Sequence, residues 1–254
     1  MMSADTLEFP TKSDWKRIYN SSPFQGLFSL LAQFENSGFG KDKKTQDFFT
    51  GMELQKYLYE VRQRLEDVAI SYILMMYYYG KGIPDKRWYV SPSKDGHSIQ
   101  YYPDFTKRDF HIKGWFDFYS DTFYYKLFSA WDLVGHMIKV AYGLGIKKRA
   151  ISFSTAVDAL GKIKENEPLY RRLNEEIQKS PEFTKAKNIR RDITHNYLPN
   201  VAGIRVDRSD DLKSLSLKAS YITSEEIVAN AQKALDLFAK TIGILLASAR
   251  DKAD

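Results

Sequence analysis

The chain has four histidines and no cysteine, so few of its residues can carry chemistry that depends on an imidazole or a thiolate. His97, His111, His136 and His195 do not follow the spacing of metal ligands on a helix. The sequence also lacks the glycine loop that binds phosphate and the G-x-S-x-G turn of serine hydrolases. We therefore expect no metal ion and no cofactor. Turn polarity explains His97, and an apolar helical setting favours a structural role for His136.

His195 stands in a different setting, near the end of the basic segment 185–197. Arg190 precedes it by five positions, and Arg191 precedes it by four, which places Arg191 on the same helix face. Arg190 would lie about 140° around the helix, so only its long side chain brings the guanidinium towards a shared phosphate. Asp192 is placed to fix the tautomer of the ring or to pair with a lysine. Last-turn carbonyls favour the protonated imidazole by roughly 0.3–1 kcal/mol, which suits a proton donor near neutral pH.

The elements that must position these residues are mainly helical, because apolar residues recur at alternating steps of three and four. Helices are expected over residues 24–35, 45–79, 122–144, 155–164, 169–179, 181–197 and 223–249. Ser180-Pro181 is a good start for the helix that carries Arg190 and His195, since a proline at the first helical position removes an N–H that has no partner within the helix. The helix over 45–79 would be on the order of 50 Å long and must pack along its length. The pattern predicts an elongated, all-α helical bundle.

Between the two longest helices the sequence changes character. Asp95-Gly96 stands between two short runs of β-favouring residues, which predicts a hairpin, and residues 212–222 are a second candidate for extended structure. We predict one domain over residues 1–254, with a small β-hairpin in an aromatic-rich insertion at about 85–118. A division into two domains near residues 147–152 is the alternative.

Composition narrows the class of protein further. The chain is 43% apolar and 28% charged with 14 Gly and 8 Pro, which is typical of a globular protein rather than a disordered one. The net charge of +6 favours a polyanionic partner such as nucleic acid. No signal peptide pattern is visible, and the longest apolar stretches fall short of the about 20 residues that a membrane span needs. With no cysteine to form disulfides, we expect a cytoplasmic protein that does not enter the membrane.

The spacing of Arg190 and His195 within IRRDITHNY, late in a chain of long helices, resembles the HEPN superfamily and its R-x4-6-H motif. The resemblance implies a compact helical bundle that forms a homodimer. It also implies a metal-independent endoribonuclease of toxin–antitoxin or antiviral defence systems. The chain departs from the family pattern at Arg191, where a small polar residue is usual, and Asp192 stands one position later.

The same resemblance implies a mechanism. The 2′-hydroxyl of the RNA attacks the adjacent phosphorus, His195 acts as general acid or base, and Arg190 stabilises the phosphorane. We assign Asp192 as the third catalytic residue. Lys187, Arg191 and Asn196 are assigned to contacts with the RNA. A two-fold axis would bring two copies of the motif into one cleft.

Two alternatives stay open. In the first, the chain is a catalytically inactive HEPN-like domain that binds RNA, a nucleotide or a partner protein such as an antitoxin or a nucleotidyltransferase. Arg191, which stands directly after the motif arginine where a small polar residue is usual, favours this alternative. In the second, the protein is a helical interaction module with no role in nucleic-acid binding, and its aromatic residues form the working surface.

Overall fold

The computed structural model describes residues 8–37, 39, 48–87, 89–90, 99–100, 105–196, 198–200, 204–208, 215–219 and 221–251. Its α-helices are α1 (Lys12–Asn20), α2 (Phe24–Asn36), α3 (Phe48–Tyr79), α4 (Lys107–Ala141), α5 (Phe153–Leu160), α6 (Glu167–Arg172), α7 (Pro181–His195) and α8 (Ser224–Asp251). Short helical turns are η2 (Asp85–Arg87), η3 (Lys148–Ala150), η4 (Lys164–Asn166) and the π-helical η5 (Leu173–Gln178). The prediction of a mainly α-helical bundle is confirmed.

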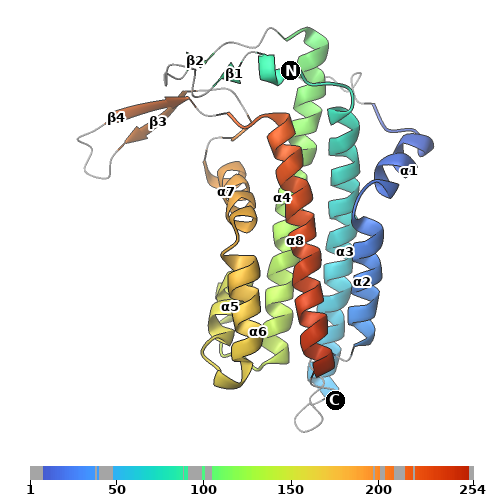
Figure 1. The fold of residues 1–254 in the computed structure, drawn as a ribbon, viewed down its shortest axis with the longest axis vertical. Helices are drawn as coiled ribbons and strands as arrows, with labels where there is room; N and C mark the ends of the chain where they lie inside the picture. The colour runs from blue at the N-terminus through green and yellow to red at the C-terminus, as the bar shows by residue number, and fades with distance from the viewer. Residues whose placement is uncertain are drawn as a thin grey trace.

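The long helices α3, α4 and α8 run side by side along the molecule, and α2 packs beside them (Figure 1). Helices α3 and α4 are antiparallel, because ring contacts pair Tyr57 with His136 at one end and Tyr79 with Phe116 at the other. Trp131 of α4 is fully buried at the centre, where its ring lies 5.4 Å from that of Phe238 in α8. Burial of these large rings holds the bundle together.

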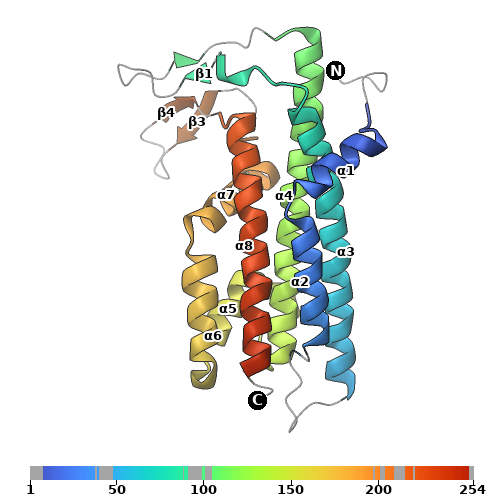
Figure 2. The same ribbon diagram turned by 45° about the vertical axis from the view of Figure 1, so that its right-hand side comes forward.

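Helices α5, α6 and α7 form a second layer against α4 and α8 (Figure 2). Gly135 allows the close approach of α4 and α5, since a Cβ at that position would lie 2.7 Å from the Ser152 carbonyl oxygen. The layer places α7 beside α4, with its C-terminal end directed towards the start of α8 (Figure 1).

The expected start of α4 near residue 122 is wrong, because the helix begins at Lys107. Thr106 accepts a hydrogen bond from the Asp109 N–H, and the Asp109 carboxylate accepts one from the Thr106 N–H, which completes a capping box. The aromatic residues that follow form the faces of this helix: the ring of Trp115 lies 6.3 Å from that of Tyr78 on α3. Residues 107–118, assigned above to the insertion, therefore belong to the bundle.

The strands are short antiparallel pairs at the end of the bundle where α8 begins (Figures 1 and 2). Their bounds are β1 (Tyr89–Val90) paired with β2 (Ile99–Gln100), and β3 (Ile204–Arg208) paired with β4 (Leu215–Ala219). The expected hairpin turn at Asp95-Gly96, together with His97, lies outside the described residues, so the β-hairpin insertion stays a prediction. In the described ranges, no helix has the length and hydropathy of a bilayer span.

Candidate active site

The motif segment folds as α7, and its limits follow from its sequence. Ser180 caps the first turn by accepting a hydrogen bond from the Phe183 N–H at 3.1 Å, and Pro181 occupies the first helical position. The buried residues of the helix are Phe183, Ala186 and Ile189. The Phe183 ring lies 5.1 Å from that of Trp131 in an edge-to-face contact. One face of α7 therefore rests on α4, and the opposite face is exposed.

Arg190 lies two helical turns beyond Phe183, towards α4. The residue is half-buried, and its Nε atom is buried without a hydrogen-bond partner among the described residues. On α4, the Asp132 carboxylate accepts a hydrogen bond from the Phe153 N–H at 3.1 Å. Burial raises the pKa of Asp132, while the Phe153 N–H and then the charges of Arg190, His136 and Lys187 oppose that shift. Asp132 thus supplies a negative charge beneath the cations of α7.

His195 is the last residue of α7 and is exposed. Arg191 is also exposed and lies only about 40° from His195 around the helix, whereas Arg190 lies about 140° away. No hydrogen bond joins Arg190 to His195 in the part of the chain that the structure describes. Within one subunit, α7 therefore brings Arg191 and His195 onto one exposed face and directs Arg190 to another.

Asp192 and Asn196 interact with each other at the end of α7. The Asn196 Nδ2 donates to Asp192 Oδ1 at 2.8 Å, and the Asn196 N–H donates to the Asp192 carbonyl at 3.0 Å. Thr194 donates its hydroxyl proton to the Arg190 carbonyl at 2.5 Å, within the same helix. These contacts fix the backbone around His195, and the role of Asp192 in setting the ring tautomer stays a prediction.

A shallow groove of about 370 Å³ follows one side of α7. Its lining residues are Pro181, Thr184, Lys185, Asn188, Ile189, Asp192 and Ile222. Lys187, assigned to RNA contact, is exposed elsewhere on α7 and does not line this groove.

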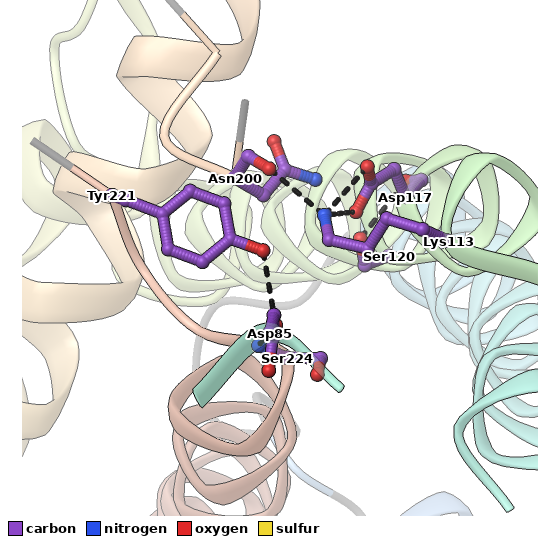
Figure 3. A network of polar contacts seen from close by, with 7 residues as sticks. All are labelled: Asp85, Lys113, Asp117, Ser120, Asn200, Tyr221 and Ser224. Carbon is purple, nitrogen blue, oxygen red and sulfur yellow. Dashed lines mark hydrogen bonds and ion pairs between the residues drawn. The ribbon is translucent and has the colours of Figure 1, made fainter. Parts of the chain in front are cut away.

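A buried polar network lies just beyond α7 (Figure 3). Lys113 of α4 donates from Nζ to the two carboxylate oxygens of Asp117 at 2.6 and 2.7 Å. The same ammonium donates to the Asn200 carbonyl at 2.8 Å and lies 5.4 Å from the centre of the Tyr221 ring. Asn200 is five residues beyond His195, so this network holds the segment that follows the motif.

Asp85 occupies the other half of the network. Its Oδ2 accepts a hydrogen bond from the Tyr221 hydroxyl at 2.9 Å and one from the Ser224 N–H at 2.7 Å. The carboxylate therefore satisfies an N–H at the first turn of α8, where negative charge is stabilising. The network joins η2, α4, the segment after α7 and the start of α8.

Burial raises the pKa of two carboxyl groups of α4, Asp117 and Asp121, towards neutral pH. Burial raises the pKa of Asp117 from the usual 3.8 to about 6, and Lys113 opposes the shift. One turn later, burial and then the charge of Asp117 raise the pKa of Asp121 to about 7. The Asp121 Oδ1 atom is buried and has no hydrogen-bond partner among the described residues.

Comparison with known proteins bears on what this arrangement does. A family model of HEPN_Cthe2314-like HEPN proteins matches residues 57–250, a range that runs from α3 to α8 and contains Arg190 and His195. The chain belongs to this HEPN family. The resemblance drawn from the motif is therefore confirmed. No curated protein and no solved structure gives a significant match to this HEPN chain.

The sequence argument missed four charged residues of this HEPN domain, which are Lys113, Asp117, Asp121 and Asp132. Lys113, Asp117 and Asp121 recur at four-residue spacing in an aromatic segment, and this spacing indicates that they share one face of a helix. Assignment of that segment to an insertion hides the spacing. Asp132 has a weaker signal, an acidic residue within an otherwise apolar stretch of helix.

Proposed function

We propose that the protein is a metal-independent HEPN endoribonuclease that acts in the cytoplasm in toxin–antitoxin or antiviral defence. The observation that carries this proposal is the R-x4-H motif of a HEPN chain on α7, with His195 exposed at the last turn. An exposed imidazole at a helix C-terminus is accessible to a large substrate.

The proposed reaction uses only groups of the RNA and of this chain. The 2′-hydroxyl attacks the adjacent phosphorus and loses its proton, and the bond to the 5′-oxygen breaks. His195 removes the proton of the 2′-hydroxyl as general base or donates one to the leaving 5′-oxygen as general acid, and the His195 of a second copy serves the other oxygen. The products are a 2′,3′-cyclic phosphate and a 5′-hydroxyl, and DNA is not cleaved because it has no 2′-hydroxyl.

Arg190 is assigned to stabilise the charge of the phosphorane, because a guanidinium offers planar, charge-assisted donors. Its Nε is buried without a hydrogen-bond partner among the described residues, and its charge interacts with that of Asp132 on α4. Asp192 and Asn196 hold the end of the helix through their mutual hydrogen bond. Lys187 and Arg191 are exposed cations that are available to the RNA backbone.

We also propose a homodimer. Arg190 and His195 are directed apart in one subunit, so a second copy would have to complete the site. An exposed aromatic stripe supports this: Phe118 and Tyr125 of α4 are 52% and 55% exposed, and they stand at seven-residue spacing with Asp132 on one helix face. A copy docked on this stripe would lie next to Asp132, whose charge interacts with that of Arg190.

The experiment incubates purified protein with single-stranded RNA in EDTA, beside Arg190→Ala and His195→Ala. Removal of a general acid–base group costs about 10²–10⁴-fold in rate, and we expect a loss of this size in His195→Ala. Removal of a donor that stabilises transition-state charge costs about 10²–10³-fold, which we expect in Arg190→Ala. Arg171→Ala is the matched control, because Arg171 is an exposed arginine of α6 that pairs with Glu175. Wild-type protein that leaves the RNA intact would contradict the proposal.

A catalytically inactive HEPN domain is the second candidate. Arg191, which replaces the usual small polar residue after the motif arginine, favours it. Such a domain would bind RNA, a nucleotide, or an antitoxin or nucleotidyltransferase partner without cleavage. Gel-shift of the same RNA in the absence of cleavage would identify this outcome.

A further inference from the structure

We propose that Lys113 and Asp117 are positioning residues for His195, and that their buried ion pair fixes the last turn of α7 by anchoring the segment that follows it. This inference rests on the proposed function, because it assigns to the pair a role at the same site. It adds two residues of α4, far from the motif in sequence, to those on which cleavage depends.

The contacts of Lys113 are the first support. The residue is only 7% exposed, and its ammonium makes three hydrogen bonds, two to the Asp117 carboxylate and one to the Asn200 carbonyl. An ammonium group has three donors, so all of them are used (Figure 3). Asp117 thus holds the charge in place, and the third donor is directed at the backbone beyond α7.

The short separation in sequence between His195 and Asn200, with hydrogen bonds at both ends, is the second support. Pro199 is buried and its carbonyl accepts a hydrogen bond from the Ile222 N–H at 2.8 Å, so two consecutive residues are tied to separate elements. On the α7 side, Asn196 is bonded to Asp192 through both its N–H and its side chain. Only two residues separate Asn196 from Pro199. The end of α7 therefore has little freedom to move once Pro199 and Asn200 are held.

The chemistry explains why such an anchor matters. A displacement of about 1 Å at a reacting group can reduce a rate about 10²-fold. His195 is exposed, so its ring is not held by packing against the bundle core. Its position therefore depends on the backbone on either side. Loss of the Asn200 anchor is expected to reduce turnover rather than substrate binding.

The test removes both charges together with Lys113→Met/Asp117→Leu, because a single change would leave one buried charge without its partner. The matched control is Lys126→Met, which removes another lysine–carboxylate pair of α4, with Asp67 at 2.8 Å, that does not touch the segment after α7. Lys113→Arg is the rescue variant, since a guanidinium can bridge the same carboxylate and carbonyl. Two readouts are compared: steady-state RNA cleavage and the imidazole NMR signals of His195, with those of His136 as an internal reference.

In the double variant we expect kcat to fall about 10²-fold with KM within about threefold of wild type, and the His195 signals to shift or broaden. Lys113→Arg should recover most of the rate, and Lys126→Met should match wild type in both readouts. Unchanged kcat and unchanged His195 signals in the folded double variant would overturn the inference. If wild type does not cleave RNA but the His195 signals still respond, the proposed function fails and the positioning of His195 by this pair stands. If the double variant does not fold, Lys113→Gln/Asp117→Asn, which removes both charges but keeps a polar group at each position, decides the question with the same readouts.

Discussion

Replacement of Asp121 by asparagine should stabilise the protein at alkaline pH and flatten the dependence of its stability on pH. In the folded chain, burial and the nearby Asp117 charge raise the pKa of the Asp121 carboxyl from 3.8 to about 7. The folded state therefore keeps a proton that the unfolded state has already released between about pH 4 and pH 7. The free energy of unfolding should fall as pH rises through this window.

The size of the effect follows from the difference in pKa. Each unit corresponds to about 1.4 kcal/mol, so the shift of Asp121 corresponds to at most about 4 kcal/mol of stability lost between acid and alkaline pH. Asp117, with its pKa near 6, adds to the same slope, but less than independently because the two charges interact. An asparagine cannot ionise, so we expect Asp121→Asn to be more stable than wild type by about 2–4 kcal/mol at pH 8 and nearly equal to it at pH 4.5.

Urea unfolding at half-unit steps from pH 4.5 to 8.5 measures this dependence directly. Asp236→Asn, a change at an exposed aspartate of α8, is the control and should keep the slope of wild type. The reasoning is refuted if wild-type stability rises between pH 5 and 8, or if Asp121→Asn keeps the wild-type slope.

Three further predictions concern packing, capping and charge. Gly135→Ala should destabilise the protein by about 1–3 kcal/mol in urea unfolding, because its Cβ would meet the backbone at the start of α5. The control is Gly243→Ala on α8, which should be neutral or stabilising because a Cβ there has open space. A strongly destabilised Gly243→Ala would count against this reading. Thr106→Ala should cost about 1 kcal/mol in the same assay through loss of the capping box, and no change would show that α4 does not depend on its cap. In titrations of RNA binding against salt, Lys187→Ala and Arg191→Ala should each reduce the slope of log K by about 0.7, and an unchanged slope would remove that residue from the RNA contact.

Much of the fold was open to prediction because its signals are local. Periodic apolar residues locate α2, α3 and α8, and Ser180-Pro181 marks the start of α7 at the residue where the helix begins. The start of α4 was missed because aromatic residues favour strands as well as buried helices, and here the partner surface of α3 decides between them. The local signal that identifies the helix is the capping box formed by Thr106 and Asp109.

Part of the candidate site could also be predicted from the sequence, and part of it could not. The R-x4-H spacing and the place of His195 near the end of a helix follow from the sequence, and the HEPN family is confirmed by the family match. The contact of Lys113 with the Asn200 carbonyl joins residues 87 positions apart, and the pairing of Asp85 with Tyr221 joins residues 136 apart. Contacts of this kind depend on how the helices pack, so neither periodicity nor spacing in a single sequence indicates them.

The most direct test of the account is the chemistry of the RNA ends produced in EDTA by wild type and by His195→Ala. The account predicts fragments that carry a 2′,3′-cyclic phosphate and a 5′-hydroxyl from wild type, and loss of these fragments in the variant. Intact RNA with wild type, fragments that carry a 5′-phosphate, or undiminished cleavage by His195→Ala would contradict it.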